Sequence, residues 1–278
     1  MGLTAIVFPG QGSQTPDMRQ TVERQRPDLI GLITEIVGED PFARADEGTQ
    51  FAQPAIMCAS LAGWDALERP RGDMLAGHSL GEFGALVAAG SMGESDALEL
   101  VALRGRLMQE AGESAGDGGM LALLGSGAAD HAQALADAHG LSVANDNSPQ
   151  QIVLSGAREA LPAAAEEAEG LRLRAMTLPV TGAFHSPMMA SAAPAFAAAL
   201  DRVEISEPAV PVISAVTAAP FDDVRERLVE ALTSPVRWRE TLLAMHELGA
   251  ERFVDVGPGR VLTGLAKRTL SGVELVNA

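Results

Sequence analysis

The sequence predicts an α/β fold in which a parallel sheet carries a sharp serine turn and a small antiparallel unit is inserted. Three observations predict it. Residues 4–8 form a β-branched and aromatic run that ends in a glycine-rich loop, as the first strand of an α/β sheet does. A serine flanked by glycines, Gly77-His78-Ser79-Leu80-Gly81, stands between a short strand and a helix. Over residues 118–183 the rhythm of strand and helix signals changes.

The main domain is predicted from two stretches of chain, residues 1–117 and 184–278. Short apolar runs bounded by breakers indicate strands, and apolar residues at helical spacing indicate helices. Together with the serine turn they predict an α/β-hydrolase-like core with a parallel sheet and a nucleophile elbow. The expected strands are 4–8, 74–76, 211–216 and 252–256, and the expected helices are 82–89, 95–110, 191–200, 222–232, 241–248 and 261–270.

Residues 118–183 are predicted to form an inserted subdomain. Its signals follow the order βαββαβ, which is the ferredoxin-like arrangement, and about 65 residues are enough to build it. Residues 145–149, Asn-Asp-Asn-Ser-Pro, are expected to be the turn between the two middle strands. The expected elements are strands 120–124, 141–144, 151–155 and 171–178 and helices 128–138 and 160–169.

Composition excludes several classes of protein. The 278 residues include 20 basic and 37 acidic side chains, a net charge of −17, which disfavours nucleic-acid binding but allows an anionic substrate where positive charge is placed locally. Cys58 is the only cysteine, which excludes an internal disulfide and a cysteine-based zinc site. We also find no targeting signal and no apolar run of membrane-spanning length, so a cytoplasmic protein is expected.

Ser79 is the candidate nucleophile. Small residues two positions before and after it allow a tight turn that projects the hydroxyl from the tip of a strand. The N-terminus of the helix that follows would favour negative charge at the same place. A glycine-rich turn with an incidental serine remains the alternative at this stage.

A serine hydroxyl needs a base, and His185 is the candidate. It lies in a loop at the end of a predicted strand, where the chain re-enters the main domain. His78 adjoins the serine, but neighbouring side chains on a sharp turn diverge. The other histidines are expected on the insert's surface, at His131 and His139, or in a helix, at His246.

Arg104 is the unusual charge of the main domain. It shares a helical face with Ala97, Val101 and Met108, at the spacing of a buried stripe. A buried guanidinium keeps its charge and is costly to leave without a partner. Either an internal carboxylate or the carboxylate of a ligand is expected to pair with it, and the sequence alone supports both equally.

Six motifs in order resemble one family. They are Phe8-Pro9-Gly10-Gln11-Gly12-Ser13-Gln14, Gly77-His78-Ser79-Leu80-Gly81-Glu82, Leu103-Arg104-Gly105-Arg106, the stretch from Asn147-Ser148-Pro149-Gln150 to Ser155-Gly156, Gly182-Ala183-Phe184-His185-Ser186, and Asp255-Val256-Gly257-Pro258-Gly259. Through these motifs the chain resembles malonyl-CoA:acyl carrier protein transacylases and the acyltransferase domains of fatty-acid and polyketide synthases. The resemblance extends from residue 4 to about residue 270.

The resemblance implies a ping-pong acyl transfer. Ser79 would attack the thioester of malonyl-CoA while His185 takes its proton, and the malonyl ester would then pass to the phosphopantetheine thiol of acyl carrier protein. The backbone N–H groups of Gln11 and Leu80 would form the oxyanion hole. Arg104 would bind the malonyl carboxylate through two hydrogen bonds.

The resemblance also implies three residues around this centre. The backbone carbonyl of Ala231 would orient His185. Phe184 would crowd the space that an α-methyl group needs, which favours malonyl over methylmalonyl, although one methyl group is worth only about 1 to 3 kcal/mol. Met108 is assigned with Phe184 and Arg104 to substrate binding.

The implied partners are acyl carrier protein and a coenzyme A thioester, with no nucleic acid, no membrane, no metal and no cofactor, and a monomer is expected. Both partners are anionic, so a local basic rim is needed, at Arg260, Lys267 and Arg268 or at Arg172 and Arg174. The alternative function is a serine hydrolase or thioesterase with the same elbow, although hydrolases with this elbow place their histidine later in the chain. A non-catalytic carrier-docking subunit is disfavoured, because none of the expected site residues is missing.

Overall fold

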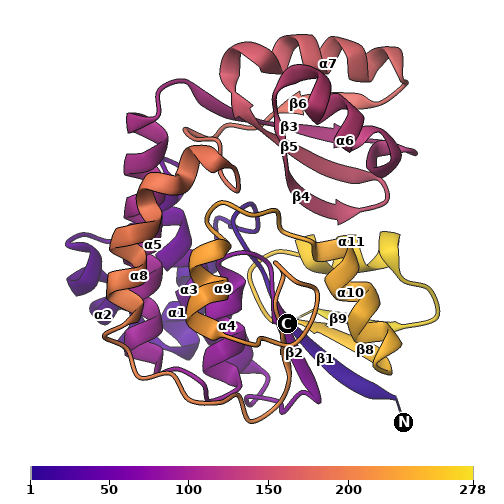
Figure 1. Ribbon diagram of the computed structural model, residues 1–278. Helices are drawn as coiled ribbons and strands as arrows, with labels where there is room; N and C mark the ends of the chain where they lie inside the picture. The colour runs from indigo at the N-terminus through magenta and orange to yellow at the C-terminus, as the bar shows by residue number, and fades with distance from the viewer. Residues whose placement is uncertain (1, 278) are drawn as a thin grey trace.

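The computed structural model describes residues 2–277, and its larger sheet is wholly parallel (Figure 1). The strand order is β7-β2-β1-β8-β9. Each neighbouring pair runs in the same direction, so the predicted parallel sheet is confirmed. The strands are β1 (Leu3–Phe8), β2 (Met74–Gly77), β7 (Val212–Ile213), β8 (Ala250–Asp255) and β9 (Glu274–Asn277).

Helices cover both faces of this sheet because its central strand is apolar on both sides. Ile6 and Phe8 of β1 face the layer with α3, α4 and α5, whereas Ala5 and Val7 face the layer with α10 and α11. The helices of the main domain are α1 (Met18–Gln25), α2 (Pro27–Val37), η1 (Pro41–Arg44), α3 (Thr49–Ala66), α4 (Gly81–Ala88), α5 (Glu94–Ser114), η3 (Pro187–Ala192), α8 (Ala193–Leu200), α9 (Val224–Glu230), α10 (Trp238–Glu247) and α11 (Val261–Thr269).

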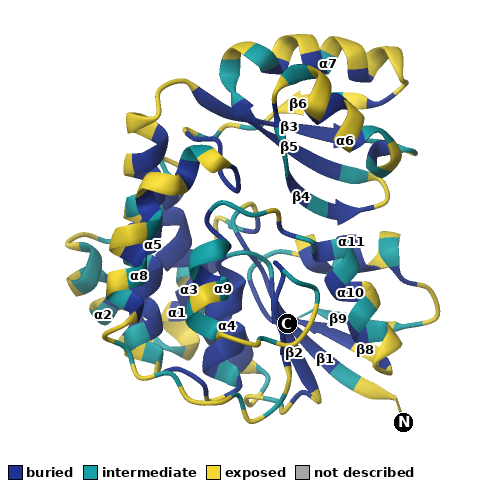
Figure 2. Cartoon of the chain, viewed as in Figure 1, coloured by how far each residue is buried: buried dark blue, intermediate teal, exposed yellow. Residues whose placement is uncertain are grey.

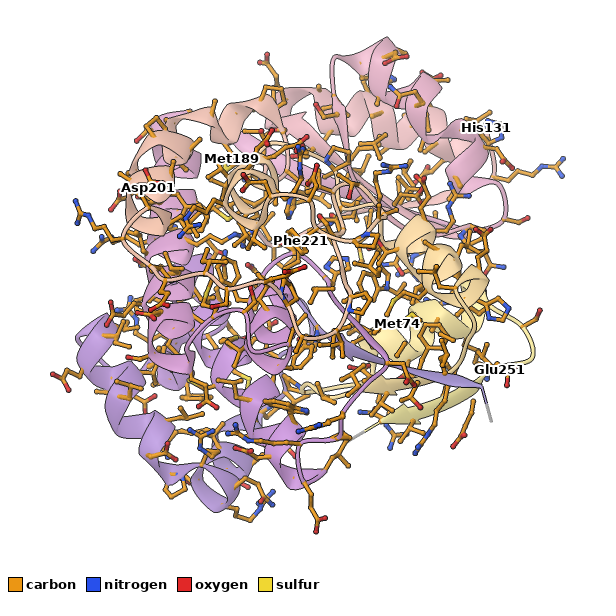
Figure 3. All side chains as sticks on the ribbon, turned by 60° about the horizontal axis from the view of Figure 1, so that its bottom comes forward. Met74, His131, Met189, Asp201, Phe221 and Glu251 are labelled. Carbon is orange, nitrogen blue, oxygen red and sulfur yellow. The ribbon has the colours of Figure 1, made fainter. Side chains whose placement is uncertain are left out.

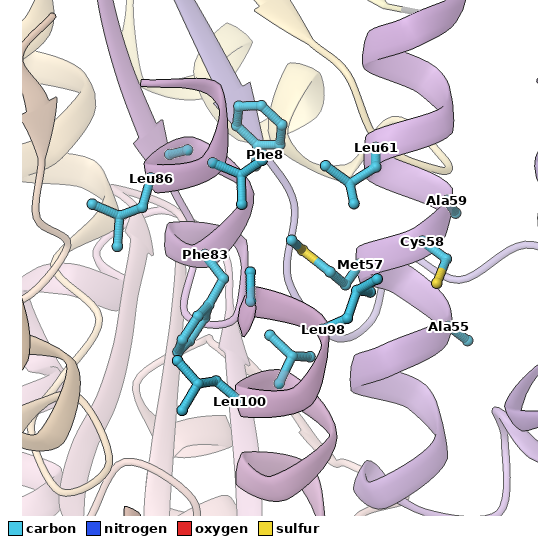
Figure 4. Close-up of a cluster of buried hydrophobic side chains, with 14 of the residues drawn as sticks. Phe8, Ala55, Met57, Cys58, Ala59, Leu61, Phe83, Leu86, Leu98 and Leu100 are labelled. Atoms are coloured by element: carbon cyan, nitrogen blue, oxygen red, sulfur yellow. The ribbon is translucent and has the colours of Figure 1, made fainter. Parts of the chain in front are cut away.

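Helix α3 is buried along almost its whole length, with 15 of its 18 residues shielded from solvent (Figure 2). Figure 4 shows Met57 and Leu61 on the side of α3 that faces Phe8 and Phe83, and Cys58 on another side. All five side chains are buried, and Phe83 belongs to the helix that follows the serine turn. The elbow is therefore supported from below by a tightly packed apolar core.

The insert forms a second, antiparallel sheet with the strand order β4-β5-β3-β6. One face of this sheet packs on α6 and α7 through Leu121, Leu123, Ile152 and Leu154. The opposite face joins the core of the main domain. The elements are β3 (Gly118–Leu124), α6 (Ala128–His139), β4 (Ser142–Ser148), β5 (Gln151–Ala157), η2 (Arg158–Ala160), α7 (Leu161–Gly170) and β6 (Arg174–Thr177).

The structure corrects several expected boundaries. The expected turn at 145–149 is wrong for most of its length, because β4 continues to Ser148 and pairs with β5, which satisfies the backbone of these polar residues. The strand expected at 211–216 is limited to two residues, and the strand expected at 171–178 is limited to four. Strand β9 was not expected, and α5 continues to Ser114. No helix within residues 2–277 is long and apolar enough to cross a membrane.

Candidate functional site

Ser79 sits on a turn between β2 and α4 that only small neighbours allow. Its φ of 54° lies in the left-handed region, which costs a non-glycine residue free energy. A Cβ on Gly77 would lie 1.9 Å from the backbone of Gly81, and a Cβ on Gly81 would lie 2.1 Å from the carbonyl oxygen of Phe8. Because residues 77 and 81 are glycines, the backbone packs closely enough to hold Ser79 at the tip of β2.

His185 lies against this serine. Its Nε2 is 2.9 Å from Ser79 Oγ, and its Nδ1 is 2.8 Å from the carbonyl oxygen of Ala231. Because Nδ1 faces a carbonyl, Nδ1 carries the proton, and Nε2 accepts a hydrogen bond from the serine hydroxyl. His185 also has a left-handed backbone, with φ at 57°.

The pKa of His185 is lowered to about 3, first by burial and then by the positive charge of Arg104. The backbone carbonyls of Ala231 and Ser234 oppose that shift. The imidazole is therefore neutral at pH 7, as a proton acceptor must be.

Arg104 also points at the serine. Its side chain is 2% exposed, and its Nη2 donates to Ser79 Oγ over 3.0 Å. Nη1 donates to Oε1 of Gln53 over 2.8 Å, so its other partner is a neutral amide. Within residues 2–277 the guanidinium forms no ion pair with an acidic side chain, and of the two alternatives drawn from the sequence the internal salt bridge is absent there.

Burial lowers the pKa of Arg104 to about 10, and the charge of Glu82 opposes this shift. Burial likewise raises the pKa of Glu82 to about 7, while hydrogen bonds from the Ala215 N–H and the Ser214 hydroxyl oppose it. Glu82 is therefore bonded to other groups and acts on Arg104 only through its field. The guanidinium keeps its charge at pH 7 without a bonded anion.

Gln11 and Leu80 bring two backbone amides to this centre. The His78 N–H donates to the Phe8 carbonyl, and a Cβ on Gly10 would lie 2.4 Å from the His78 carbonyl, so the loop after β1 touches the elbow. In the described chain, residues 2–277, neither the Gln11 N–H nor the Leu80 N–H donates to a protein acceptor. Both amides are therefore available to donate to a ligand.

Gln53 and Thr49, both on α3, are functional candidates that the sequence analysis missed. Gln53 Nε2 donates to Thr49 Oγ1 over 2.9 Å, and Thr49 Oγ1 donates to the side-chain oxygen of Gln11 over 2.7 Å. With its bond to Arg104, Gln53 links the guanidinium to the loop that carries the Gln11 amide. The signal that could have found it is a glutamine inside an otherwise apolar, buried helix.

Phe184 and Met108 are both buried and belong to the same apolar cluster as the elbow helix. Met108 Sδ lies 3.3 Å from Gln53 Nε2. A Cβ on Gly182 would lie 2.9 Å from Cε1 of Phe184, so the size of the residue at 182 controls where the phenyl ring can sit. Phe184 is the residue before His185, and Met108 lies beside Gln53, which bonds to Arg104. Both predicted pocket residues therefore adjoin the site.

His131, His139, His246 and Asp255 make other contacts. Figure 3 labels His131 on the outer rim of the insert, and His139 pairs there with Glu167. His246 faces the carbonyl of Ala250. Asp255 accepts from the N–H and hydroxyl of Thr263, as a structural residue does.

Of the residues expected to form a basic rim, Arg268 borders a hollow of about 430 Å³ on the face of the insert sheet that is turned away from α6 and α7. Arg260, Lys267 and Arg172 are exposed, and Arg174 begins β6. The hollow is lined by Ala122, Leu124, Gly125, Gln150, Gln151, Val153, Met176, Leu178 and Arg268.

The chain matches known proteins over almost its whole length. Residues 28–277 match the family described as "Acyl transferase domain". The malonyl CoA-acyl carrier protein transacylase of Salmonella typhimurium is 39% identical over 285 residues, which cover 95% of this chain and 92% of that protein. The polyketide biosynthesis protein ThaF of Burkholderia thailandensis is 40% identical over 97% of this chain, but the chain spans only 24% of that protein.

A solved structure has the same fold. It is a malonyl-transacylase in complex with its type II PKS acyl-carrier protein, and it superposes with a TM-score of 0.88 at 34% identity. The match covers 99% of this chain and 96% of that one. By sequence and by fold, this chain belongs to the acyl transferase domain family and groups with malonyl CoA-acyl carrier protein transacylases.

Proposed function

We propose that this chain transfers a malonyl group from malonyl-CoA to the phosphopantetheine thiol of an acyl carrier protein, through a malonyl ester on Ser79. The names of its relatives support the reaction, and the solved complex of a similar transacylase with its carrier protein supports the partner. The single observation that carries the proposal is the buried guanidinium of Arg104, which touches the candidate nucleophile and has no acidic partner within residues 2–277.

Arg104 selects the substrate in this proposal. A hydrolase for uncharged acyl chains gains nothing from a buried cation next to its serine, because burying the charge costs free energy. A malonyl thioester carries a carboxylate at its far end, two bonds from the carbonyl carbon that reacts. Two parallel hydrogen bonds from the guanidinium to this carboxylate would repay the cost of burial and hold the thioester carbonyl over the hydroxyl.

In the first half-reaction, Ser79 Oγ attacks the thioester carbonyl carbon and His185 Nε2 takes the hydroxyl proton. The carbonyl oxygen becomes an oxyanion, which accepts hydrogen bonds from the backbone N–H groups of Gln11 and Leu80. The C–S bond then breaks, and the proton on Nε2 goes to the departing thiolate. The products are coenzyme A and a malonyl ester of Ser79.

The second half-reaction is the reverse with a different thiol. His185 Nε2 takes the proton of the phosphopantetheine thiol, and the sulfur attacks the ester carbonyl. The C–O bond to Ser79 breaks, and the proton returns from Nε2 to Oγ. Throughout, the carbonyl of Ala231 holds the Nδ1–H and stabilises the imidazolium that forms in each transition state.

We further propose that the pocket prefers malonyl to methylmalonyl groups. Phe184 is buried beside His185, and Met108 is buried one helical turn from Arg104. An α-methyl group next to the reacting carbonyl would have to displace one of these side chains. Because Gly182 leaves room for the Phe184 ring to move, the preference is expected to be modest.

The proposal includes the division of the chain into a catalytic domain, residues 1–117 and 184–278, and an insert, residues 118–183. The strand order of the insert, β4-β5-β3-β6 with two helices on one face, supports a ferredoxin-like unit. The strand–turn–helix around Ser79 supports a hydrolase-like core. The proposal also includes a monomer that needs no cofactor or metal, and a cytoplasmic location, which the free Cys58 supports.

Intact-mass spectrometry with malonyl-CoA and a carrier protein tests this function. We expect the chain to gain the mass of one malonyl group, to lose it when holo-carrier protein is added, and to acylate the carrier. Ser79→Ala is expected to gain no mass. A mass gain in that variant would contradict the role of Ser79, and release of free malonate without carrier acylation would favour the hydrolase.

A further inference from the structure

The insert reaches the candidate active site through one strand, β4. Oδ1 of Asn147, near the end of β4, lies 2.7 Å from Nε2 of His78, the residue before Ser79. The His78 ring also packs edge to face on Trp238, with the ring centroids 5.4 Å apart. Asn147 is 7% exposed and Trp238 is fully buried. The histidine of the elbow is thus held between the insert and the first residue of α10.

The same strand holds the segment 231–239, which begins with the carbonyl partner of the catalytic histidine. The Val236 N–H donates to the Ala144 carbonyl over 2.8 Å, and the Asp146 N–H donates to the Val236 carbonyl over 2.9 Å. Arg239 then forms a two-pronged ion pair with Asp146, at 2.9 Å from Nε to Oδ1 and 2.7 Å from Nη2 to Oδ2. Strand β4 therefore contacts the residue before Ser79 and the segment that begins with the carbonyl partner of His185.

We infer that Asn147 is a positioning residue. Its amide holds His78, and β4 also pairs with Val236. Through these two contacts the insert sets the geometry between Ser79 and His185. The inference rests on the proposed function. A displacement of about 1 Å between reacting groups can cost about 100-fold in rate, so a contact one residue from the nucleophile is able to control the reaction. Because the amide is neutral, it does so without adding a charge beside His185.

The test compares Asn147→Ala with Asn145→Ala. Both asparagines lie on β4 and are 7% exposed, but only the side chain of Asn147 bonds to His78. Rapid-quench intact-mass measurements would give the rate constant of Ser79 acylation and the KM for malonyl-CoA. We expect Asn147→Ala to lower the rate constant about 10- to 100-fold with KM unchanged. For Asn145→Ala we expect a rate constant within about twofold of wild type.

Two further readouts separate positioning from a merely structural role. In ¹H NMR spectra, the Nδ1–H resonance of His185 is expected to shift or broaden in Asn147→Ala and to stay unchanged in Asn145→Ala. In a double-mutant cycle with His78→Ala, the loss of rate in the double variant is expected to equal the loss in Asn147→Ala alone, because the two residues act as a pair.

Several outcomes would overturn the inference. Equal acylation rates in Asn147→Ala and wild type would do so, as would a raised KM with an unchanged rate constant, since the latter means direct contact with substrate. If Asn147→Ala does not fold, Asp146→Asn weakens the same attachment through Arg239, and an unchanged acylation rate there would also overturn it. A wild-type chain that malonyl-CoA does not acylate would instead contradict the proposed function.

Discussion

Two arginines, one half-buried and one buried, have opposite kinds of partner. Arg26, which lies between α1 and α2, contacts three carboxylates, those of Asp28, Asp65 and Glu94, each at 2.8 Å. These contacts, the hydrogen bond to Asp28 first, hold the pKa of Arg26 above its usual range. Arg104 is buried, bonds only to neutral groups within residues 2–277, and has a pKa lowered to about 10 by burial.

The difference separates an arginine whose charge is paired within the protein from one whose charge is available to a ligand. The ion pairs of Arg26 join helices that are distant in the sequence, so their anions come from the protein. Arg104 lies inside α5, and among the residues that the structure describes its side chain bonds only to the amide of Gln53 and the hydroxyl of Ser79. A guanidinium left in this way is ready to bind an anion from outside the chain.

Removing each arginine should have different consequences. Arg104→Ala is expected to lower malonyl transfer about 1000-fold, because the substrate carboxylate loses its buried partner, and to spare acetyl transfer. The measurement is the acylation rate with malonyl-CoA and with acetyl-CoA. Arg26→Ala is the matched control, and we expect lower thermal stability with an unchanged acylation rate. Equal losses of malonyl and acetyl transfer in Arg104→Ala would show that Arg104 does not recognise the carboxylate.

Placing an acidic side chain beside Arg104 should give it an ion-pair partner within the protein, as Arg26 has. Gln53→Glu places a carboxylate where an amide now accepts from Nη1, so it is expected to compete with malonyl groups and lower their transfer about 10- to 100-fold. Gln109→Glu introduces the same change at a buried glutamine that does not contact Arg104, and it should leave the ratio of malonyl to acetyl transfer unchanged. An unaltered ratio in Gln53→Glu would mean that the guanidinium does not select the substrate.

The smallest expected effect concerns Glu82, whose charge Arg104 senses without a bond. Because burial raises the pKa of Glu82 from 4.5 to about 7, its contribution to stability is present below pH 4.5 and is lost as the pH rises through 7. Relative to Glu82→Gln, wild type should therefore lose about 2 kcal/mol of unfolding free energy between pH 5 and pH 7.5. Urea denaturation at several pH values measures this, and a parallel pH dependence in the two proteins would contradict it.

The sequence predicted much of the main domain and three polar side chains that meet in the structure, those of Ser79, His185 and Arg104. Their motifs are local, since the glycines that permit the turn and the helical spacing of Arg104 are both visible within a few residues. The parallel sheet followed from short apolar runs, although β7 and β9 could not be predicted well. β7 is two residues long, and β9 is an edge strand that is only partly buried.

What the sequence did not reveal depends on contacts between distant residues. Gln53 and Arg104 are 51 positions apart, and His78 and Asn147 are 69 positions apart, so no spacing rule connects them. The strand through Asn145 was taken for a turn because its composition is typical of turns. Pairing with β5 and the bridge to Val236 override that local preference.

The backbone of the two reacting residues has a consequence for the evolution of this protein. Ser79 and His185 both occupy left-handed conformations, which cost a side-chain-bearing residue about 1 kcal/mol or more each and cost glycine almost nothing. A chain freed from selection for chemistry would relieve this strain by accepting glycine at position 79, whereas glycine at position 185 would also remove a buried ring and its hydrogen bond to Ala231. Stability therefore favours loss of the nucleophile, and selection for the reaction opposes that loss.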